Sequence, residues 1–420
     1  MGAHTIANAN AMPAITWHRL RMNDVDIELP EGLIPGTTIT VEAPERLLGE
    51  PGAFEAALAE MQLHLDAAGK PADERAVVRA IDPETDPHDL DVPAVSAYEA
   101  HAVREELANN VADSFGPGMG KQATAYLSEI GADSHVVLAP KAGTREEATI
   151  RIEGVDGEAS ATLIDVVAEP HSELDLTVSL DSPAVGRGLL GAQLRVFAGE
   201  GARVNVTSAH TMDESWVALD NTGVVLAKGA RVNVRHRLIG GGKTYTGLYA
   251  DLRGDASRLD VDTRYLAAHA DERDINYIVK HRGKKTLCNI EANGVLMGMS
   301  RKTFRGTIDL VHGCKGSEGS ERETVLLVDE KVDNQTIPVI LCDEDDVAGN
   351  HGATIGHVRP SQLFYLGCRG LSPEAAEGLF ATATLEEAAL NIPDARVRAG
   401  VDRLADRLGV PYESVREVEE

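Results

Sequence analysis

The hydrophobic positions in the first 133 residues recur mainly at helical spacing. One stripe has apolar residues at i, i+4, i+7 and i+11: Phe54, Leu58, Met61 and Leu65. This spacing places them on one face and predicts an amphipathic helix that ends near Gly69. Helical spacing returns over residues 97–109, whereas residues 71–93 contain four prolines among many acids and predict a loop or linker. Residues 1–133 are therefore expected to form a mixed region in which helices are prominent.

From residue 134 to residue 358 the pattern changes to short runs in which apolar and polar residues alternate. Residues 174–178 (LDLTV) follow a turn at residues 170–172, and residues 259–261 (LDV) follow a turn at residues 254–255. Alternation with a period of two behind a turn is the pattern of a β-strand.

Two of these runs are identical in sequence. Residues 201–206 (GARVNV) recur at residues 229–234, 28 residues later, and neighbouring turns follow at spacings of 30 and 25 residues. A loose period in this range indicates a solenoid, whose units bury their apolar edges only by stacking. The sequence thus predicts a mainly β protein whose core, residues 134–358, is a right-handed parallel β-helix. A β-sandwich with an accidental hexapeptide repeat is the alternative.

The last part of the chain, residues 359–420, returns to helical spacing and is expected to form a small helical domain. Ser372 is an expected N-cap, with Pro373 and Glu374 in the first turn. A second stripe at i, i+4, i+7 and i+11 is closed by a glycine and a proline: Val397, Val401, Leu404, Leu408, Gly409 and Pro411.

Composition and charge narrow the range of partners. The formal net charge is −27, which disfavours nucleic acid and anionic membranes because both are bound by clustered Lys and Arg. No segment approaches the roughly 20 apolar residues needed to cross a bilayer, and no signal peptide is recognisable. The four cysteines are far apart and form no CxxC pair, so neither a zinc ribbon nor a disulfide framework is expected. A reduced, cytoplasmic compartment is the simplest interpretation.

Common enzyme motifs are absent from the sequence. Residues 240–244 (GGGKT) lack the spacer of a P-loop and are interpreted as a glycine-rich turn. The densest group of polar residues lies between Lys331 and His357 and combines Cys342, an acidic run at residues 343–346, and His351. Thiolate, imidazole and carboxylate groups together could receive iron. The alternative is that the acidic run is a solvated turn. His210 and His236, at the ends of the two matching strands, are expected to pack in the structure on adjacent turns.

The stretch from Asp329 to Ala383 resembles the SufB/SufD family of iron–sulfur cluster assembly scaffolds. The resemblance is carried by residues 336–338 (TIP), 345–347 (DDV), 351–356 (HGATIG), 363–366 (LFYL) and 369–371 (RGL), with residues 301–306 (RKTFRG) upstream. Together with the solenoid it covers residues 134–410.

Three positions are informative within this family. SufB proteins have Glu directly after the matching histidine, where this chain has Gly352. They also have an acceptor cysteine where this chain has Val332. At both positions the chain resembles SufD more than SufB. Many SufD proteins carry a cysteine two residues before the histidine, where this chain has Gly349. That puts in doubt any cluster ligation that requires a thiol there, and whether Cys342 could replace it is open.

The resemblance implies a scaffold subunit and no enzyme activity of its own. Such a subunit pairs with a SufB-like paralogue through the β-helix end and binds the SufC ATPase, an ABC-type protein, through its C-terminal domain. His351 would be a ligand of a transient iron ion or iron–sulfur cluster shared with SufB, with Cys342 as a weaker candidate, and no tightly bound cofactor is expected in the isolated chain. The candidate SufC-docking residues are Leu363, Phe364, Tyr365, Val397, Val401 and Leu404.

Two further hypotheses remain open from the sequence. One is a SufB-like or undifferentiated SufBD protein that forms a homodimer, as the isolated chain could also do. The other is a carbohydrate-active β-helix enzyme with paired acids in a groove. The low aromatic content, 4%, counts against the second hypothesis because sugars favour aromatic platforms.

Overall fold

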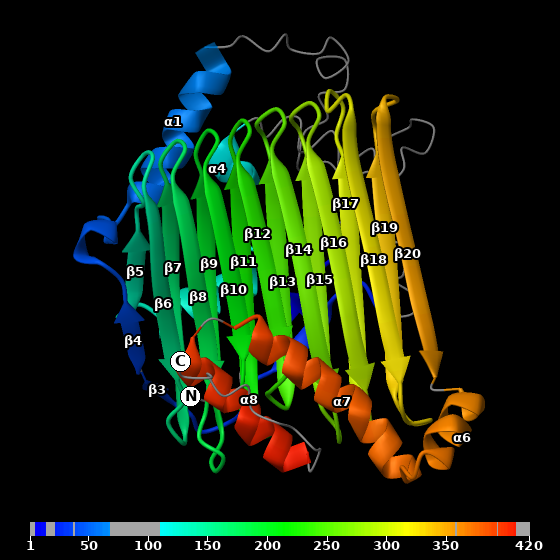
Figure 1. Ribbon diagram of the computed structural model, residues 1–420. Helices are drawn as coiled ribbons and strands as arrows, with labels where there is room; N and C mark the ends of the chain where they lie inside the picture. The colour runs from blue at the N-terminus through cyan, green and yellow to red at the C-terminus, as the bar shows by residue number, and fades with distance from the viewer. Residues whose placement is uncertain are drawn as a thin grey trace, which may run out of the picture.

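The computed structural model describes residues 5–13, 22–36, 38–67, 110–357, 359–392 and 394–408. Its body is a solenoid in which successive strands alternate between two stacked sheets (Figure 1). The linker expected at residues 71–93 and the helix expected at residues 97–109 lie outside the described residues.

The first sheet runs in the order β20-β18-β16-β14-β12-β10-β8-β6-β4. Its strands are β4 (Ile39–Glu42), β6 (Arg145–Glu153), β8 (Glu173–Asp181), β10 (Arg203–His210), β12 (Arg231–Leu238), β14 (Arg258–Ala267), β16 (Leu287–Leu296), β18 (Ser317–Leu327) and β20 (Val347–His357). The second sheet runs in the order β19-β17-β15-β13-β11-β9-β7-β3, and β5 also pairs with β7. Its strands are β3 (Ile34–Gly36), β5 (His135–Leu138), β7 (Glu158–Ala168), β9 (Gly188–Ala198), β11 (Trp216–Leu226), β13 (Lys243–Leu252), β15 (Glu272–His281), β17 (Arg301–Leu310) and β19 (Asp333–Cys342).

Apart from the antiparallel pair β4 and β6, the strands of both sheets pair in parallel. This confirms the predicted parallel solenoid and rules out the β-sandwich alternative. It also adds β3 and β4, from the region expected to be mixed and helical, to the edges of the two sheets.

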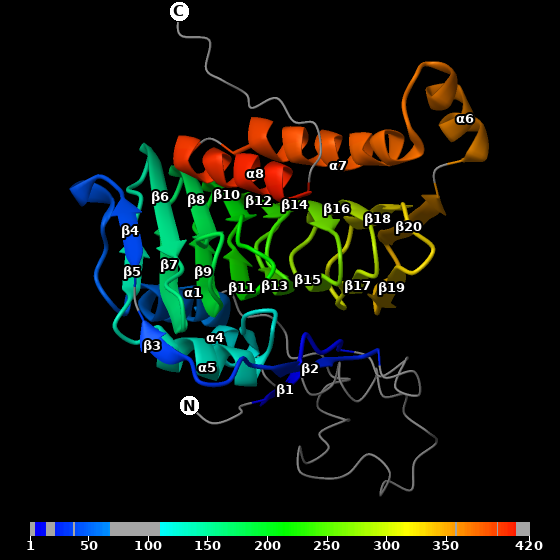
Figure 2. The same cartoon turned by 90° about the horizontal axis from the view of Figure 1, so that it is seen from below.

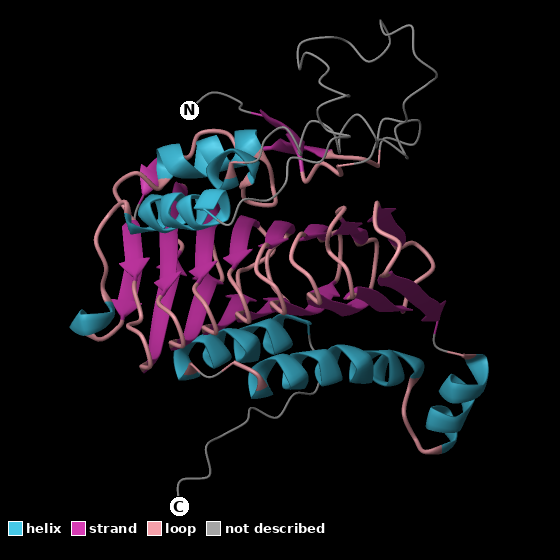
Figure 3. Ribbon diagram, turned by 90° about the horizontal axis from the view of Figure 1, so that it is seen from above, coloured by secondary structure: helices cyan, strands magenta, loops and turns pink. Residues whose placement is uncertain are grey.

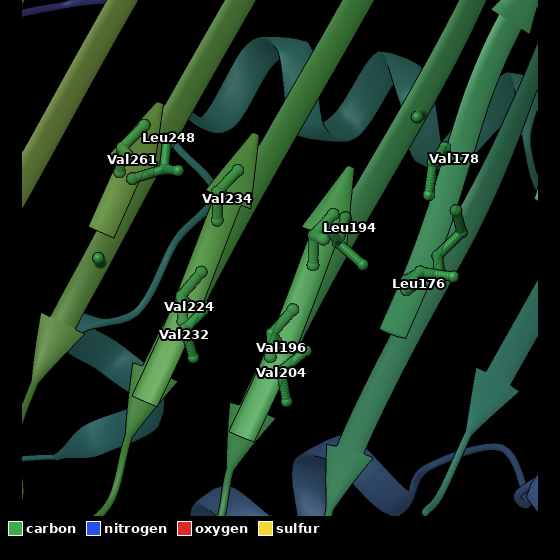
Figure 4. Packing of buried hydrophobic residues seen from close by; sticks show 14 of the residues in the cluster. Leu176, Val178, Leu194, Val196, Val204, Val224, Val232, Val234, Leu248 and Val261 are labelled. Carbon is green, nitrogen blue, oxygen red and sulfur yellow. The ribbon is translucent and has the colours of Figure 1, made fainter. Parts of the chain in front are cut away.

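The repeated hexapeptide stacks in register on adjacent turns. Val204 of β10 pairs with Val232 of β12, and both side chains are fully buried. On the opposite face of the same strands, the Asn233 side chain donates a hydrogen bond to Asn205 at 2.6 Å. Alternation therefore sends aliphatic side chains into the core, where they stack from turn to turn (Figure 4), and polar side chains outward.

A left-handed residue recurs in the turns that precede strands of the first sheet. It lies at the same place in seven turns, two residues before the first residue in register: Gly143, His171, Gly201, Gly229, Ala256, Lys285 and Gly316. Glycine adopts this conformation without steric cost, whereas the other residues carry a strain of about 1–2 kcal/mol each. The backbone geometry of the turn is thus kept even where the glycine that marks it in the sequence is lost.

The core of the middle turns contains a buried polar cluster. His210 Nε2 lies 3.1 Å from Asp220 Oδ2, which also accepts a hydrogen bond from Ser208 at 2.6 Å. His236 stacks on Tyr277, whose hydroxyl lies 2.7 Å from His236 Nδ1. The two histidines pack inside on adjacent turns, as expected, but offset by two residues, because His236 is in register with Ser208.

Helices cover both flanks of the solenoid (Figures 2 and 3). The second sheet is covered by the hairpin β1 (Thr5–Ala9) and β2 (Val25–Glu28) and by α1 (Ala53–Ala67), α4 (Val111–Ser114) and α5 (Lys121–Ile130). A short 3-10 helix, η2 (Glu45–Leu47), precedes α1. The first sheet is covered by α7 (Pro373–Leu390) and α8 (Ala395–Leu408), and α6 (Pro360–Cys368) extends beyond β20.

The predicted helical stripes are confirmed. Phe54 and Leu58 of α1 are buried against the second sheet. The Ser372 side chain accepts a hydrogen bond from the backbone of Ala375 and caps α7. No helix in the described ranges is long and apolar enough to cross a membrane.

The buried histidines predict how stability depends on pH. Burial lowers the pKa of His236 from 6.5 to about 4, despite the opposing charge of Asp220. The unfolded chain therefore binds a proton between pH 6.5 and about 4 that the folded chain does not bind. The free energy of unfolding should fall as the pH drops through this range, by roughly 3 kcal/mol for this histidine.

Urea unfolding at several pH values measures this effect. His236→Gln should show a shallower loss of stability between pH 6.5 and 4 than the unmodified chain. His64→Gln, at an exposed position of α1, should leave the slope unchanged. Equal slopes for His236→Gln and the unmodified chain would contradict the assignment of a neutral buried His236.

Candidate functional site

The solenoid stops at β19 and β20, which form an open end. Within the described chain, β20 pairs only with β18 and β19 pairs only with β17. All residues of β20 from Gly349 to Ile355 are exposed. One edge of each strand thus presents unpaired N–H and C=O groups, which favour pairing with a further strand.

His351 lies on the inward face of β20. A Cβ added to Gly349 would lie 3.0 Å from Ile340 Cγ2 of β19, so position 349 faces the opposite sheet inside the solenoid. Side chains alternate along a strand, so His351, two residues on, shares this inward face. Because no turn covers it in the described chain, the imidazole is both inward and exposed.

Directly behind His351 lies a buried carboxyl group. Glu321 of β18 is in register with His351 and is 3% exposed. Its Oε2 has no hydrogen-bond partner among the described residues. Burial, followed by the charge of Glu323, raises the pKa of Glu321 to about 8, so the group is mostly a neutral acid at pH 7.

Two residues further along β18, a second carboxyl group is firmly paired. Glu323 Oε1 accepts from Lys302 Nζ at 2.6 Å and from the Tyr265 hydroxyl at 3.0 Å. The Thr336 hydroxyl donates to Glu323 Oε2 at 2.5 Å. Lys302 and Glu323 are both fully buried, and burial lowers the pKa of Lys302. This network links β14, β17, β18 and β19 immediately behind the open end.

Cys342, the second candidate metal ligand, also lies at the open end but at another level. Ile340 of β19 and Gly349 of β20 face each other across the core, and the two strands run in opposite directions. Cys342 lies two residues beyond Ile340 and His351 two residues beyond Gly349, so they lie on opposite sides of this level. Four residues of strand separate the two levels by about 13 Å. Cys342 and His351 therefore do not meet at one ion in this structure.

The acidic run next to Cys342 forms the turn between β19 and β20. Glu344 accepts hydrogen bonds from the backbone of Gly313 and Asp345, and these bonds lower its pKa. Asp343, Asp345 and Asp346 are exposed. The run is a solvated turn that Glu344 anchors to the preceding turn.

The remaining cysteines do not add to the site. All four cysteines are free: Cys288, Cys314, Cys342 and Cys368. Burial raises the pKa of the Cys314 thiol to about 11 and that of Cys288 further, so neither is a thiolate at neutral pH. Among the described residues, no three His, Cys, Asp or Glu side chains are grouped so that they could hold a metal. Any ion at the open end would need ligands from elsewhere.

The candidate docking residues divide into two groups. In α6, Phe364 is 75% exposed and Tyr365 is 54% exposed, while Leu363 is half-buried. In α8, by contrast, the three candidates pack against the first sheet with at most 3% exposure: Val397, Val401 and Leu404. The apolar stripe of α8 therefore faces the solenoid, and among these six candidates only Phe364 and Tyr365 of α6 are exposed to solvent.

The comparisons with known proteins agree with this architecture. A family model described as SUF system FeS cluster assembly, SufBD core domain, matches residues 150–384. The chain belongs to the SufBD family of the SUF iron–sulfur cluster assembly system. Its resemblance to SufD, expected from Gly352 and Val332, is confirmed by similar SufD proteins.

The SufD protein of Bacillus subtilis is 26% identical over 216 residues, which are 51% of this chain and 49% of that protein. The SufD protein of Escherichia coli is 23% identical over 300 residues, which are 68% and 69%. A SufBD family protein of Mycobacterium leprae is 30% identical over 142 residues, which are 34% and 16%. The match thus spans about half the length of the Bacillus SufD protein and far less of the mycobacterial SufBD protein.

Sequence reasoning missed Glu321, Glu323 and Lys302. Glu321 and Glu323 occupy alternate positions of one strand. Earlier turns place aliphatic residues such as Val234 and Val261 at the position of Glu321, and His236, Thr263 and Ala292 at the position of Glu323. Acids at inward positions of a solenoid strand indicate a functional or paired site. The inward face of β18 could be assigned only once the register was known.

The Lys302–Glu323 pair allows a test of whether the buried network stabilises the turns behind the open end. Lys302→Met should lower the free energy of unfolding by about 3–5 kcal/mol, because it leaves Glu323 buried without a counter-charge. Lys302→Met combined with Glu323→Gln should recover most of this loss. Urea unfolding measures both.

An exposed ion pair on neighbouring strands provides the control. Arg301 Nε lies 3.0 Å from Asp333 Oδ2, with both side chains well exposed. Arg301→Met should cost less than about 1 kcal/mol. If Lys302→Met costs no more than this control, the buried pair does not hold the open end together.

Proposed function

We propose that this chain is a SufD-like scaffold subunit that joins a SufB-like paralogue at the open end of its solenoid. The observation that carries the proposal is His351, exposed on the inward face of β20, a strand that pairs with β18 on one edge and is unpaired on the other within the described chain. A partner strand added there would complete backbone hydrogen bonds and place its own side chains beside the imidazole. Iron, or a nascent iron–sulfur cluster, is the cargo of this shared site.

The residues at the open end fit part of such a site. Imidazole is a sound iron ligand, and His351 is accessible. The position two residues before it is Gly349, which supplies no thiol, and Cys342 is about 13 Å away along the strands. The sulfur ligands would therefore come from the partner, and no tightly bound cofactor is expected in the isolated chain. The proposed role is assembly, without a catalytic activity of its own.

The proposed second partner is a SufC-type ABC ATPase. Helix α6 begins three residues after the end of β20 and exposes Phe364 and Tyr365. The Arg369 guanidinium lies 4.9 Å from the Tyr365 ring centroid. A partner bound to α6 would pull directly on the last strand. ATP-driven movement there could open and close the shared site next to His351. We expect the complex to form in a reduced, cytoplasmic compartment, because all four cysteines are free.

The homodimeric SufBD alternative is disfavoured by Gly352 and Val332, because SufB proteins have a glutamate and a cysteine at these positions. Membership of the SufBD family leaves the carbohydrate-active enzyme without support. Co-expression with a SufB-like chain and the ATPase, followed by anaerobic purification, distinguishes a heterocomplex from a homodimer by stoichiometry.

His351→Ala should impair the activity of iron–sulfur enzymes in cells that depend on this chain, because the shared site loses its imidazole. The fold should be unchanged, since the side chain is exposed. His357→Ala is the matched control, at an exposed position of the same strand about 20 Å away. Normal iron–sulfur enzyme activity with His351→Ala would refute the role of this histidine.

Phe364→Asp should reduce co-purification of the ABC-type ATPase, because it places a charge in the exposed apolar surface of α6. Leu63→Asp on α1, where the side chain is 69% exposed, should leave co-purification intact. Val401 is unsuitable for this purpose because Val401→Asp would separate α8 from the sheet. Equal recovery of the ATPase with Phe364→Asp and Leu63→Asp would place the docking surface elsewhere.

A further inference from the structure

Glu321 differs from other acids buried in the solenoid. Asp274 accepts from Arg305 at 2.7 Å, Asp220 accepts from Ser208, and Glu323 accepts from Lys302. Glu321 is as buried as these groups, yet its Oε2 has no partner among the described residues. A buried carboxyl oxygen without a hydrogen-bond partner costs free energy, which a ligand absent from the isolated fold would offset.

The surroundings leave room for the carboxyl group but supply no side-chain donor across from it. A Cβ added to Gly306 would lie 2.4 Å from Glu321 Oε2, so the carboxyl group lies directly over this glycine. The residue in register with Gly306 on β19 is Pro338, which has no backbone N–H. Gly306 and Pro338, which face Glu321 from the opposite sheet, have no side-chain donor to offer it.

We infer that Glu321 and His351 together form a two-ligand half-site for a divalent iron ion at the open end. This inference rests on the proposed function and deepens it by adding an oxygen ligand to the imidazole. The two residues are in register on adjacent parallel strands, about 4.8 Å apart, and share the inward face. Side chains so placed can both reach one ion at about 2.1 Å.

Charge and ligand chemistry favour this ion. Glu321, Glu323 and Lys302 carry one net negative charge when Glu321 is ionised, which attracts a cation. A carboxylate with an imidazole is a ligand combination that iron(II) accepts in proteins, with its remaining positions filled by water or by further ligands. The partner chain would fill those positions in the complex, because its edge strand meets the same opening.

Anaerobic titration of the full-length chain with Fe²⁺ alone tests the half-site. The unmodified chain should bind one Fe²⁺ saturably. Glu321→Gln and His351→Ala should each weaken this binding by at least about tenfold, the lower end of the loss seen even for residues that only orient a ligand. Glu318→Gln, at an exposed outward position of the same strand, should bind Fe²⁺ as the unmodified chain does.

Glu321→Gln keeps the shape of the side chain and removes only its ability to ionise, so the fold should persist. Circular dichroism verifies this, and Glu321→Ala should show the same loss of Fe²⁺ affinity if the Gln variant does not accumulate. Unchanged affinity in Glu321→Gln with loss in His351→Ala would overturn the role of Glu321 and leave the proposed function standing. Absence of saturable binding to the unmodified chain, or unchanged affinity in both variants, would overturn the half-site, whereas the proposed function is tested separately in cells.

Discussion

The in-register parallel ladder is the constraint on which the rest of this structure depends. Each turn satisfies the backbone hydrogen bonds of the turn before it and exposes a new set, so a ladder must end on unpaired groups unless something covers them. At the beginning of the solenoid, the antiparallel strand β4 and the short strands β3 and β5 take up part of this edge. At the other end, β19 and β20 remain open in the described chain.

The same stacking places polar side chains at the open end without requiring a loop. An inward position is repeated on every turn, so the side chains of one row can change from aliphatic to polar while the backbone stays the same. The row that contains Leu176, Val206 and Val234 is aliphatic through the middle turns and becomes Glu321 and then His351 at the end. The last turn, with the Lys302–Glu323 network behind it, thus presents polar groups at the open end. Helix α6, which begins three residues after the last strand, provides a second exposed surface.

The repeat architecture could be predicted from the sequence because alternation and the recurring hexapeptide encode the stacking directly. The helical stripes of α1 and α8 were equally plain. What could not be predicted was the direction in which a stripe faces: Val401 was a candidate for docking, but it packs on the solenoid because the flank of the first sheet offers apolar residues such as Leu266. Glu321 was missed for a related reason, since the inward face of β18 depends on a register that turns of varying length obscure. The separation of Cys342 from His351 likewise follows from strands that run in opposite directions across the core.

We propose that a SufB-like partner joins this chain at the open edge of β20. Amide hydrogen exchange, measured on the isolated chain and on its complex with that partner, tests the claim most directly. We expect the amides of residues 349–355 that point away from β18 to exchange freely in the isolated chain and to become protected in the complex, while amides of β10 and β12 stay protected in both. Unchanged exchange over residues 349–355 in a verified complex would contradict it.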